Sequence, residues 1–84
     1  MNLVILTPEK EVYQGEVKSV KVPGSAGQFE ILNGHAAIVS SLMEGQVRIL
    51  DNAGNKLLYR IEQGFIEVIN NEVSLLVRGL SEVE

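Results

Sequence analysis

Glycine recurs along this chain at intervals that separate short segments rich in Val, Ile and Leu. Short apolar segments with turn signals every ~8–12 residues are typical of a β-sandwich or barrel. No segment sustains a 3.6-residue apolar period over several turns, so we expect little or no helix. The glycines that mark the intervals are Gly15, Gly24, Gly27, Gly34, Gly45, Gly54, Gly64 and Gly79.

The pattern predicts an all-β fold, a flattened β-sandwich or barrel of two packed sheets with about eight to ten short strands. With 84 residues, the chain is expected to form a single domain over residues 1–84. Residues 36–44 fit a short helix or a strand, and the β-branched pair Ile38 and Val39 favours strand slightly. The other expected strands are 3–7, 11–14, 17–22, 28–32, 46–51, 56–61, 65–69 and 72–77.

Glycines set several of the expected connections. Gly15 is expected to end the second strand, and Gly45 to follow the ambiguous segment as a stop. Gly24 and Gly27 enclose Ser25-Ala26, which predicts a tight turn with a glycine on each side. A G-x-x-G loop also occurs in nucleic-acid-binding KH domains, but there it needs flanking helices and basic residues.

Two Asn-containing pairs and one change of parity complete the expected topology. Asn33-Gly34 and Asn70-Asn71 are expected to form hairpin turns, because Asn and Gly tolerate positive φ. Val17 stands at an odd-numbered position of the strand, whereas Val20 and Val22 stand at even-numbered positions. Since successive side chains of a strand alternate faces, a β-bulge near Ser19 is predicted.

Several strands carry apolar residues on both faces. In the first strand Leu3 and Ile5 lie on one face, and Val4 and Leu6 lie on the other. In the expected strand near the C-terminus, Leu76 lies on the face opposite to that of the apolar residues on either side of it. A sandwich exposed to water on its outer faces should instead alternate apolar and polar residues. A partner that covers one sheet face accounts for the whole set, and Leu76 is expected to point outward towards it.

The residue inventory offers little for chemistry. There is one histidine, His35, and no cysteine, so neither a zinc site nor a cofactor is expected. Ser25 does not lie in the G-x-S-x-G elbow of a serine hydrolase. We therefore expect no catalytic residue and no small-molecule substrate, and His35 is interpreted as a structural or interface residue.

The charge and hydropathy exclude two further classes of partner. Seven Lys and Arg against eleven Asp and Glu give a net charge of −4, without the basic stripe of a nucleic-acid binder. No apolar run approaches the ~20 residues of a membrane span, so no direct membrane insertion is expected.

An alternative function remains open on composition alone: a small β-barrel that binds oligonucleotides or carbohydrate. It would need basic and aromatic residues together on one strand face. The aromatic residues Tyr13, Phe29, Tyr59 and Phe65 are few and dispersed, which weighs against it. A fragment of an enzyme would need a convergent polar site, which the sequence does not offer.

Three segments carry a family resemblance. Residues 15–36 read GEVKSVKVPGSAGQFEILNGHA, similar to the pattern G-x-V-x-x-V-x-V-P-G, then G-x-F or G-x-L, then I/V-L-P-G-H-A-P. Residues 42–49, LMEGQVRI, are similar to L-x-x-G-x-V-R-I, and residues 64–73 to G-F-x-E-V-x-x-N-x-V. In this order they cover nearly the whole chain, which resembles the N-terminal β-sandwich domain of the epsilon subunit of bacterial F-type ATP synthases.

The sequence departs from that pattern at a few positions. Asn33 and Ala37 stand where the family usually has Pro, and Gln63 replaces the first glycine of a usual pair. The family commonly continues into a C-terminal helical hairpin, whereas this sequence ends at Glu84, which fits either a short epsilon-type chain or a trimmed one. The inhibitory and ATP-binding roles credited to that hairpin are therefore not carried over.

The resemblance implies a non-catalytic central-stalk subunit of a proton- or sodium-driven rotary ATP synthase. Such a subunit docks on the gamma subunit near the c-ring, helps couple rotation to ATP synthesis, and is held peripherally at the cytoplasmic face of the bacterial inner membrane. By the same resemblance, one loop region faces gamma and the c-ring. With Leu76, the expected interface residues are Gln28, Glu30, Asn33, Gly34 and His35.

Overall fold

The structure is a computed structural model that describes residues 1–83, and strands joined by turns account for their regular structure. No helix occurs among these residues, in agreement with the predicted all-β class. The strands are β1 (Asn2–Leu6), β2 (Glu11–Gly24), β3 (Gly27–Leu32), β4 (Ile38–Leu42), β5 (Gly45–Asp51), β6 (Lys56–Ile61), β7 (Gln63–Ile69), β8 (Glu72–Arg78) and β9 (Ser81–Glu82).

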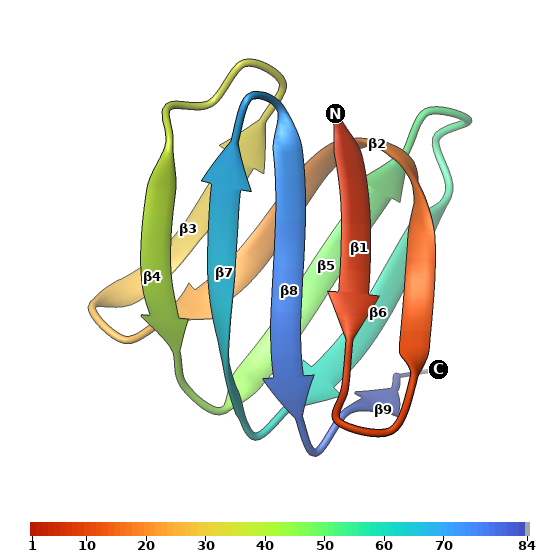
Figure 1. Ribbon diagram of the computed structural model, residues 1–84. Helices are drawn as coiled ribbons and strands as arrows, with labels where there is room; N and C mark the ends of the chain where they lie inside the picture. Colours follow the sequence, from red (N-terminus) through yellow and green to blue (C-terminus); the bar gives the residue numbers. More distant parts are fainter. Residues whose placement is uncertain (84) are drawn as a thin grey trace.

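The strands form one continuous sheet that folds over into two layers (Figure 1). The front layer runs β4, β7, β8, β1, and the back layer runs β3, β2, β5, β6, β9. Neighbouring strands are antiparallel, apart from the parallel pair β1 and β8. The predicted sandwich is confirmed, although its extents of 27 × 26 × 22 Å make it only slightly flattened.

Strand β2 is longer than expected, and the predicted strand end at Gly15 is wrong. Gly15 pairs with Leu3 of β1, and the ladder between these strands continues on both sides of the glycine. A glycine stops a strand only where no neighbouring strand holds its backbone extended. The pairing with β1 supplies that support from a distant part of the sequence.

The predicted β-bulge near Ser19 is confirmed. The register between β2 and β5 shifts between Val17 and Ser19. Val17, Ser19 and Val20 are all buried, so the strand changes its inward face at this point. The bulge lets β2 pair with β1 in the front layer and with β3 and β5 in the back layer.

One predicted hairpin turn is confirmed and another is wrong. Asn70 and Asn71 have φ values of 48° and 64° and join β7 to β8, as a type I′ turn requires. At the second site, the Leu32 carbonyl accepts from the His35 N–H at 3.1 Å, and Gly34 has a φ of 80°. This turn joins β3 in the back layer to β4 in the front layer, so the strands on either side of it cannot pair as a hairpin.

Between the layers lies a core of aliphatic side chains. Inward positions of β1, β7 and β8 meet those of β2, β5 and β6, and full burial of each such side chain contributes about 1.5–3 kcal/mol. The largest of the fully buried side chains are Leu3, Ile5, Ile31, Ile49, Ile61, Ile66, Leu75, Val17, Val20, Val22, Val47 and Val68.

The turn after β5 gives the fold a pH-dependent contribution. Asp51 Oδ1 accepts from the backbone N–H of Asn55 at 2.8 Å and of Ala53 at 2.9 Å. These bonds, led by the Asn55 N–H, hold the pKa of Asp51 below its ordinary value of 3.8. A depressed folded-state pKa means stabilisation that is complete above the unfolded-state pKa and is lost as pH falls through the folded-state pKa.

We therefore expect Asp51→Asn, which keeps an acceptor oxygen but removes the charge, to lower Tm at pH 7. The difference from wild type should shrink as the pH falls from 3.8 through the lower folded-state pKa of Asp51, because the carboxylate of the wild type is progressively protonated over that range. Thermal unfolding followed by circular dichroism from pH 7 downwards measures this. A Tm difference that stays constant over that range would contradict the role given to the carboxylate.

Candidate functional site

The outer surface of the front layer carries apolar side chains that point away from the core. Phe65 on β7 and Leu76 on β8 pair directly and are 56% and 48% exposed. Leu6 on β1 pairs with Leu76 from the other side. Since cross-strand neighbours on one face contact each other, these three side chains form a continuous apolar row.

Three further apolar residues flank this row. Val39 on β4 is 70% exposed, Val4 on β1 is half-buried, and Ile69 is exposed at the end of β7. Four of the seven exposed large hydrophobic side chains of residues 1–83 belong to this surface, and this concentration makes it the candidate interaction site. We define the front apolar face as Val4, Leu6, Val39, Phe65, Ile69 and Leu76.

A surface depression of about 560 Å³ lies at one end of the front apolar face. Gly64, Phe65 and Leu76 of the β7–β8 ladder are among its lining residues. A depression of this kind suits an apolar side chain of a docked protein. It is lined by Leu6, Thr7, Pro8, Ser41, Leu42, Gln63, Gly64, Phe65, Leu76, Val77 and Arg78.

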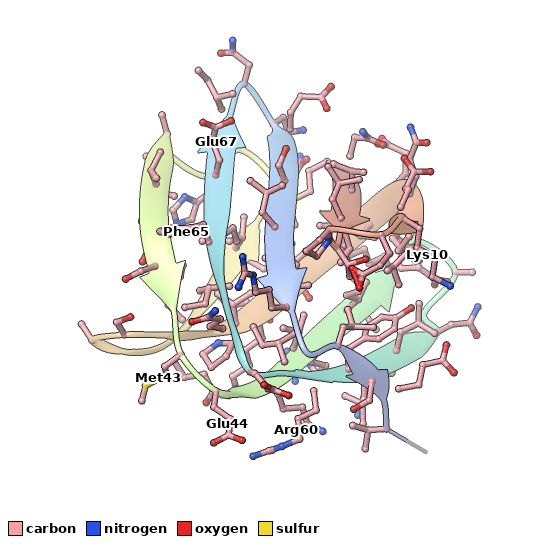
Figure 2. All side chains as sticks on the ribbon, turned by 60° about the horizontal axis from the view of Figure 1, so that its bottom comes forward. Lys10, Met43, Glu44, Arg60, Phe65 and Glu67 are labelled. Atoms are coloured by element: carbon pink, nitrogen blue, oxygen red, sulfur yellow. The ribbon has the colours of Figure 1, made fainter. Side chains whose placement is uncertain are left out.

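The outer surface of the back layer is different in character. Arg48 on β5 pairs with Glu30 on β3 at 2.7 Å, next to Lys21 of β2. Arg60 on β6 lies 3.9 Å from Glu44, and Figure 2 shows these two side chains at the lower end of the molecule. The back layer therefore presents paired charges, whereas the front layer presents apolar surface.

The residues predicted as an interface do not form one patch. Gln28 and Glu30 are exposed on β3, in the back layer, and Leu76 lies on the front apolar face. Asn33, Gly34 and His35 occupy the loop between β3 and β4. The interface residues predicted from the sequence include Leu76 but not Phe65, Leu6 and Val39. The apolar residues on both faces of their strands could have indicated these three residues as well.

Asn33 and Gly34 take part in a hydrogen-bonded cluster with the β7–β8 turn. Asn71 Nδ2 donates to Asn33 Oδ1 at 2.7 Å, and the Gly34 N–H donates to Asn71 Oδ1 at 2.9 Å. The ammonium group of Met1 also donates to Asn33 Oδ1, at 3.2 Å. His35 Nδ1 lies 2.7 Å from the Ala36 carbonyl oxygen, a local contact that orients the ring. These contacts fix the loop next to the N-terminus of β1.

The aromatic residues do not provide a stacking surface. Tyr13 and Tyr59 pack on the core, and desolvation raises the pKa of each phenol, with a smaller contribution from Asp51 and Glu82 respectively. Phe29 also packs against the core, which leaves Phe65 as the one exposed aromatic side chain of residues 1–83. Stacking of successive bases needs several exposed rings, so this surface does not suit single-stranded nucleic acid.

The described chain offers no site for a metal ion. Residues 1–83 contain no group of three His, Cys, Asp or Glu residues arranged to hold a metal ion. Within the same residues, no helix is long and apolar enough to cross a membrane.

Two-layered topology and the front apolar face together define a small β-sandwich binding module. The family described as "ATP synthase, Delta/Epsilon chain, beta-sandwich domain" matches residues 1–82. The chain belongs to this family, as its sequence motifs predicted.

Individual relatives agree with this assignment. The ATP synthase epsilon chain of Chlorobium limicola is 40% identical over 79 residues, which cover 94% of this chain and 90% of that one. The ATP synthase epsilon chain of Campylobacter jejuni (strain RM1221) is 44% identical over 79 residues, 94% of this chain and 61% of that one. The chain thus spans about three fifths of the length of the Campylobacter relatives.

Two solved structures share the fold. A chain of the Euglena gracilis mitochondrial ATP synthase, in its OSCP/F1/c-ring assembly, superposes with a TM-score of 0.90 at 22% identity, covering 95% of this chain and 51% of that one. A chain of the Tetrahymena thermophila mitochondrial ATP synthase central stalk/c-ring has a TM-score of 0.79 at 18% identity, covering 95% and 64%.

Proposed function

We propose that this chain is a non-catalytic central-stalk subunit of a rotary F-type ATP synthase. It forms one module that docks on the gamma subunit, lies near the c-ring, and helps couple proton- or sodium-driven rotation to ATP synthesis. Membership of the delta/epsilon family supports this role, as do relatives named ATP synthase epsilon chain. In a bacterial cell the complex would hold it at the cytoplasmic face of the inner membrane.

The observation that carries the proposal is the front apolar face. An exposed apolar row on three neighbouring strands is costly for a monomer in water, and a protein partner removes that cost by covering it. The proposed task is mechanical: the module turns with the stalk and transmits force through its interfaces. For that task a tightly packed β-sandwich and a large dry contact matter more than reactive side chains.

We also propose that the residues from the family resemblance serve two neighbours rather than one. Gln28 lies near the start of β3 and His35 in the loop after its end, and the four residue steps from Gln28 to Leu32 span about 13 Å along the strand. A docked gamma subunit and the nearby c-ring could each contact one of these regions. Leu76, on the front apolar face, belongs to the gamma contact in this arrangement.

The proposal predicts a stable complex with the gamma subunit encoded by the same organism. Co-expressed and purified through a tag on gamma, the chain should elute with it at a ratio of one to one. Added to membranes whose synthase lacks its epsilon chain, it should restore ATP-driven ion pumping. A chain that elutes alone as a monomer and leaves pumping unrestored would refute the proposed role.

A further inference from the structure

Charged residues are ordered along the outer surface of the front layer. Arg78 pairs with Gln63 in the row at one end of β8. The next row along the strands is apolar on β7, β8 and β1, where it contains Phe65, Leu76 and Leu6, and it ends at Glu11 on β2. The following row contains Glu67, which pairs with Ser74. The row at the far end of the strands contains, in register, Ile69, Glu72, Asn2 and Glu16. A cation thus stands at one end of the apolar row and carboxylates at the other.

The spacing of these rows sets the size of what they contact. Residues on one face of a strand recur every second position, or about 6.6 Å. Arg78 and Glu72 on β8 are six residues apart, so their side chains start about 20 Å from each other along the strand. A helix of about 13 residues spans the same distance. Figure 2 shows Phe65 and Glu67 following one another along β7 within this span.

These charges form no ion pair within the part of the chain that the structure describes. Both ion pairs of residues 1–83 are made by arginines of the back layer, Arg48 and Arg60. Arg78, Glu67 and Glu16 are exposed and form no ion pair, and Glu72 accepts only from the Asn2 amide at 3.2 Å. The front-layer charges are therefore available to a partner, while those of the back layer are already matched.

We propose that the front apolar face receives a partner segment with charges in the reverse order. The segment presents an acidic group to Arg78, apolar side chains to Phe65 and Leu76, and basic groups to Glu67 and Glu72. This inference rests on the proposed function, in which the segment belongs to the gamma subunit. Because the two ends differ in sign, the charges admit one direction of the segment and oppose the reversed one.

A second copy of this chain fits the same face less well. A two-fold axis that lies in the face and runs across the strands would bring Arg78 of each copy to the carboxylate end of the other, whereas one that runs along the strands would set Arg78 against Arg78. With the first axis, each guanidinium would face the group of Glu16, Glu67 and Glu72, with two carboxylates left unmatched at each end. Like charges across an interface oppose association, so a partner that supplies several basic groups is favoured.

The test measures association of the whole chain with purified gamma subunit by stopped-flow or surface plasmon resonance. Glu67→Lys and Arg78→Glu reverse one charge at each end of the face. Glu44→Lys and Lys56→Glu, both exposed and outside the front layer, are the matched controls for the change in net charge. We expect each front-layer reversal to slow association about tenfold at low ionic strength, and less at high salt, whereas the controls stay within about twofold.

The sign of the Arg78→Glu effect decides the order of the charges. If this variant associates faster, the partner surface is basic throughout and the proposed order is wrong. If wild type binds gamma but front-layer reversals behave like the controls, the inference fails and the proposed function stands. If wild type does not bind gamma at all, both fail. Sedimentation of the chain alone should give a monomer, and a dimer that either front-layer reversal dissociates would make the second copy the occupant and overturn the inference.

Discussion

Replacing Leu76 by Asp should weaken binding to the gamma subunit at least about 30-fold, equivalent to about 2 kcal/mol, while changing the free energy of unfolding by less than about 0.5 kcal/mol. Leu76 is 48% exposed and lies at the centre of the row formed with Phe65 and Leu6. A carboxylate there would be desolvated by the partner in the complex but hydrated in the free chain. Titration calorimetry against gamma and urea unfolding of the isolated chain measure the two quantities separately.

The adjacent residue on the same strand gives the opposite result. Leu75 is 0% exposed, so Leu75→Asp would bury an unpaired carboxylate between the layers. The cost, about 4 kcal/mol or more, is comparable with the roughly 4–12 kcal/mol that 0.05–0.15 kcal/mol per residue gives for 84 residues. We expect this variant to be largely unfolded at 25 °C, as judged by its circular dichroism.

A third variant controls for apolar exposure in general. Leu32 on β3 is 55% exposed, as open to water as Leu76, but it lies in the back layer. Leu32→Asp should leave the affinity for gamma within about threefold of wild type, because rim and remote positions contribute little. If Leu32→Asp weakens binding as much as Leu76→Asp, the front apolar face is not the docking surface. Equal loss of stability for Leu76→Asp and Leu75→Asp would instead place Leu76 in the core.

Local sequence signals predicted much of the fold because they act locally in the structure. Asn70 and Asn71 adopt the positive φ values that their side chains tolerate, and a hairpin results wherever two strands flank such a pair. The bulge near Ser19 could be predicted because a change of parity leaves buried residues on both sides of a strand. Neither inference needs knowledge of which strands are neighbours.

The predictions from the sequence were wrong where pairing with strands distant in the sequence determines the local structure. Gly15 looked like a strand end, but β1 holds it in a ladder. Asn33-Gly34 looked like a hairpin turn, but the strands beside it lie in different layers. The side chain of Asn33 is held by Asn71, 38 residues away, and no local pattern encodes that contact.

The candidate docking surface was visible in the sequence only in part. Alternation separates Leu75 from Leu76, but it does not say which of them faces inward, because apolar residues occupy both faces of β8. Pairing with β7 and β1 resolves this, since it places Leu75 opposite buried Ile66 and Leu76 opposite exposed Phe65. The order of charges likewise becomes visible only when β1, β2, β7 and β8 are aligned in register.

Replacing Gly64 by Ala is the second change from which we expect a large effect, a loss of folding stability. A Cβ atom added there would lie 2.5 Å from the Leu76 carbonyl oxygen and 2.9 Å from Val77 Cγ1. The carbonyl is part of the β7–β8 ladder, so it can move away only if the two strands separate. We expect Gly64→Ala to lower the free energy of unfolding by about 3 kcal/mol, as measured by urea denaturation.

Gly54→Ala is the matched control for this substitution. Gly54 has a φ of 88° but nothing within 4 Å of an added Cβ, so alanine there should cost only about 1 kcal/mol of backbone strain. If Gly54→Ala costs as much as Gly64→Ala, backbone conformation rather than strand contact explains both losses.

Gln63, the neighbour of Gly64, is exposed and points away from the core. A side chain is therefore accommodated at this position in place of the glycine of the family pattern. Because the β7–β8 ladder that Gly64→Ala would disturb also aligns Phe65 with Leu76, this variant should bind gamma more weakly than its stability alone would predict.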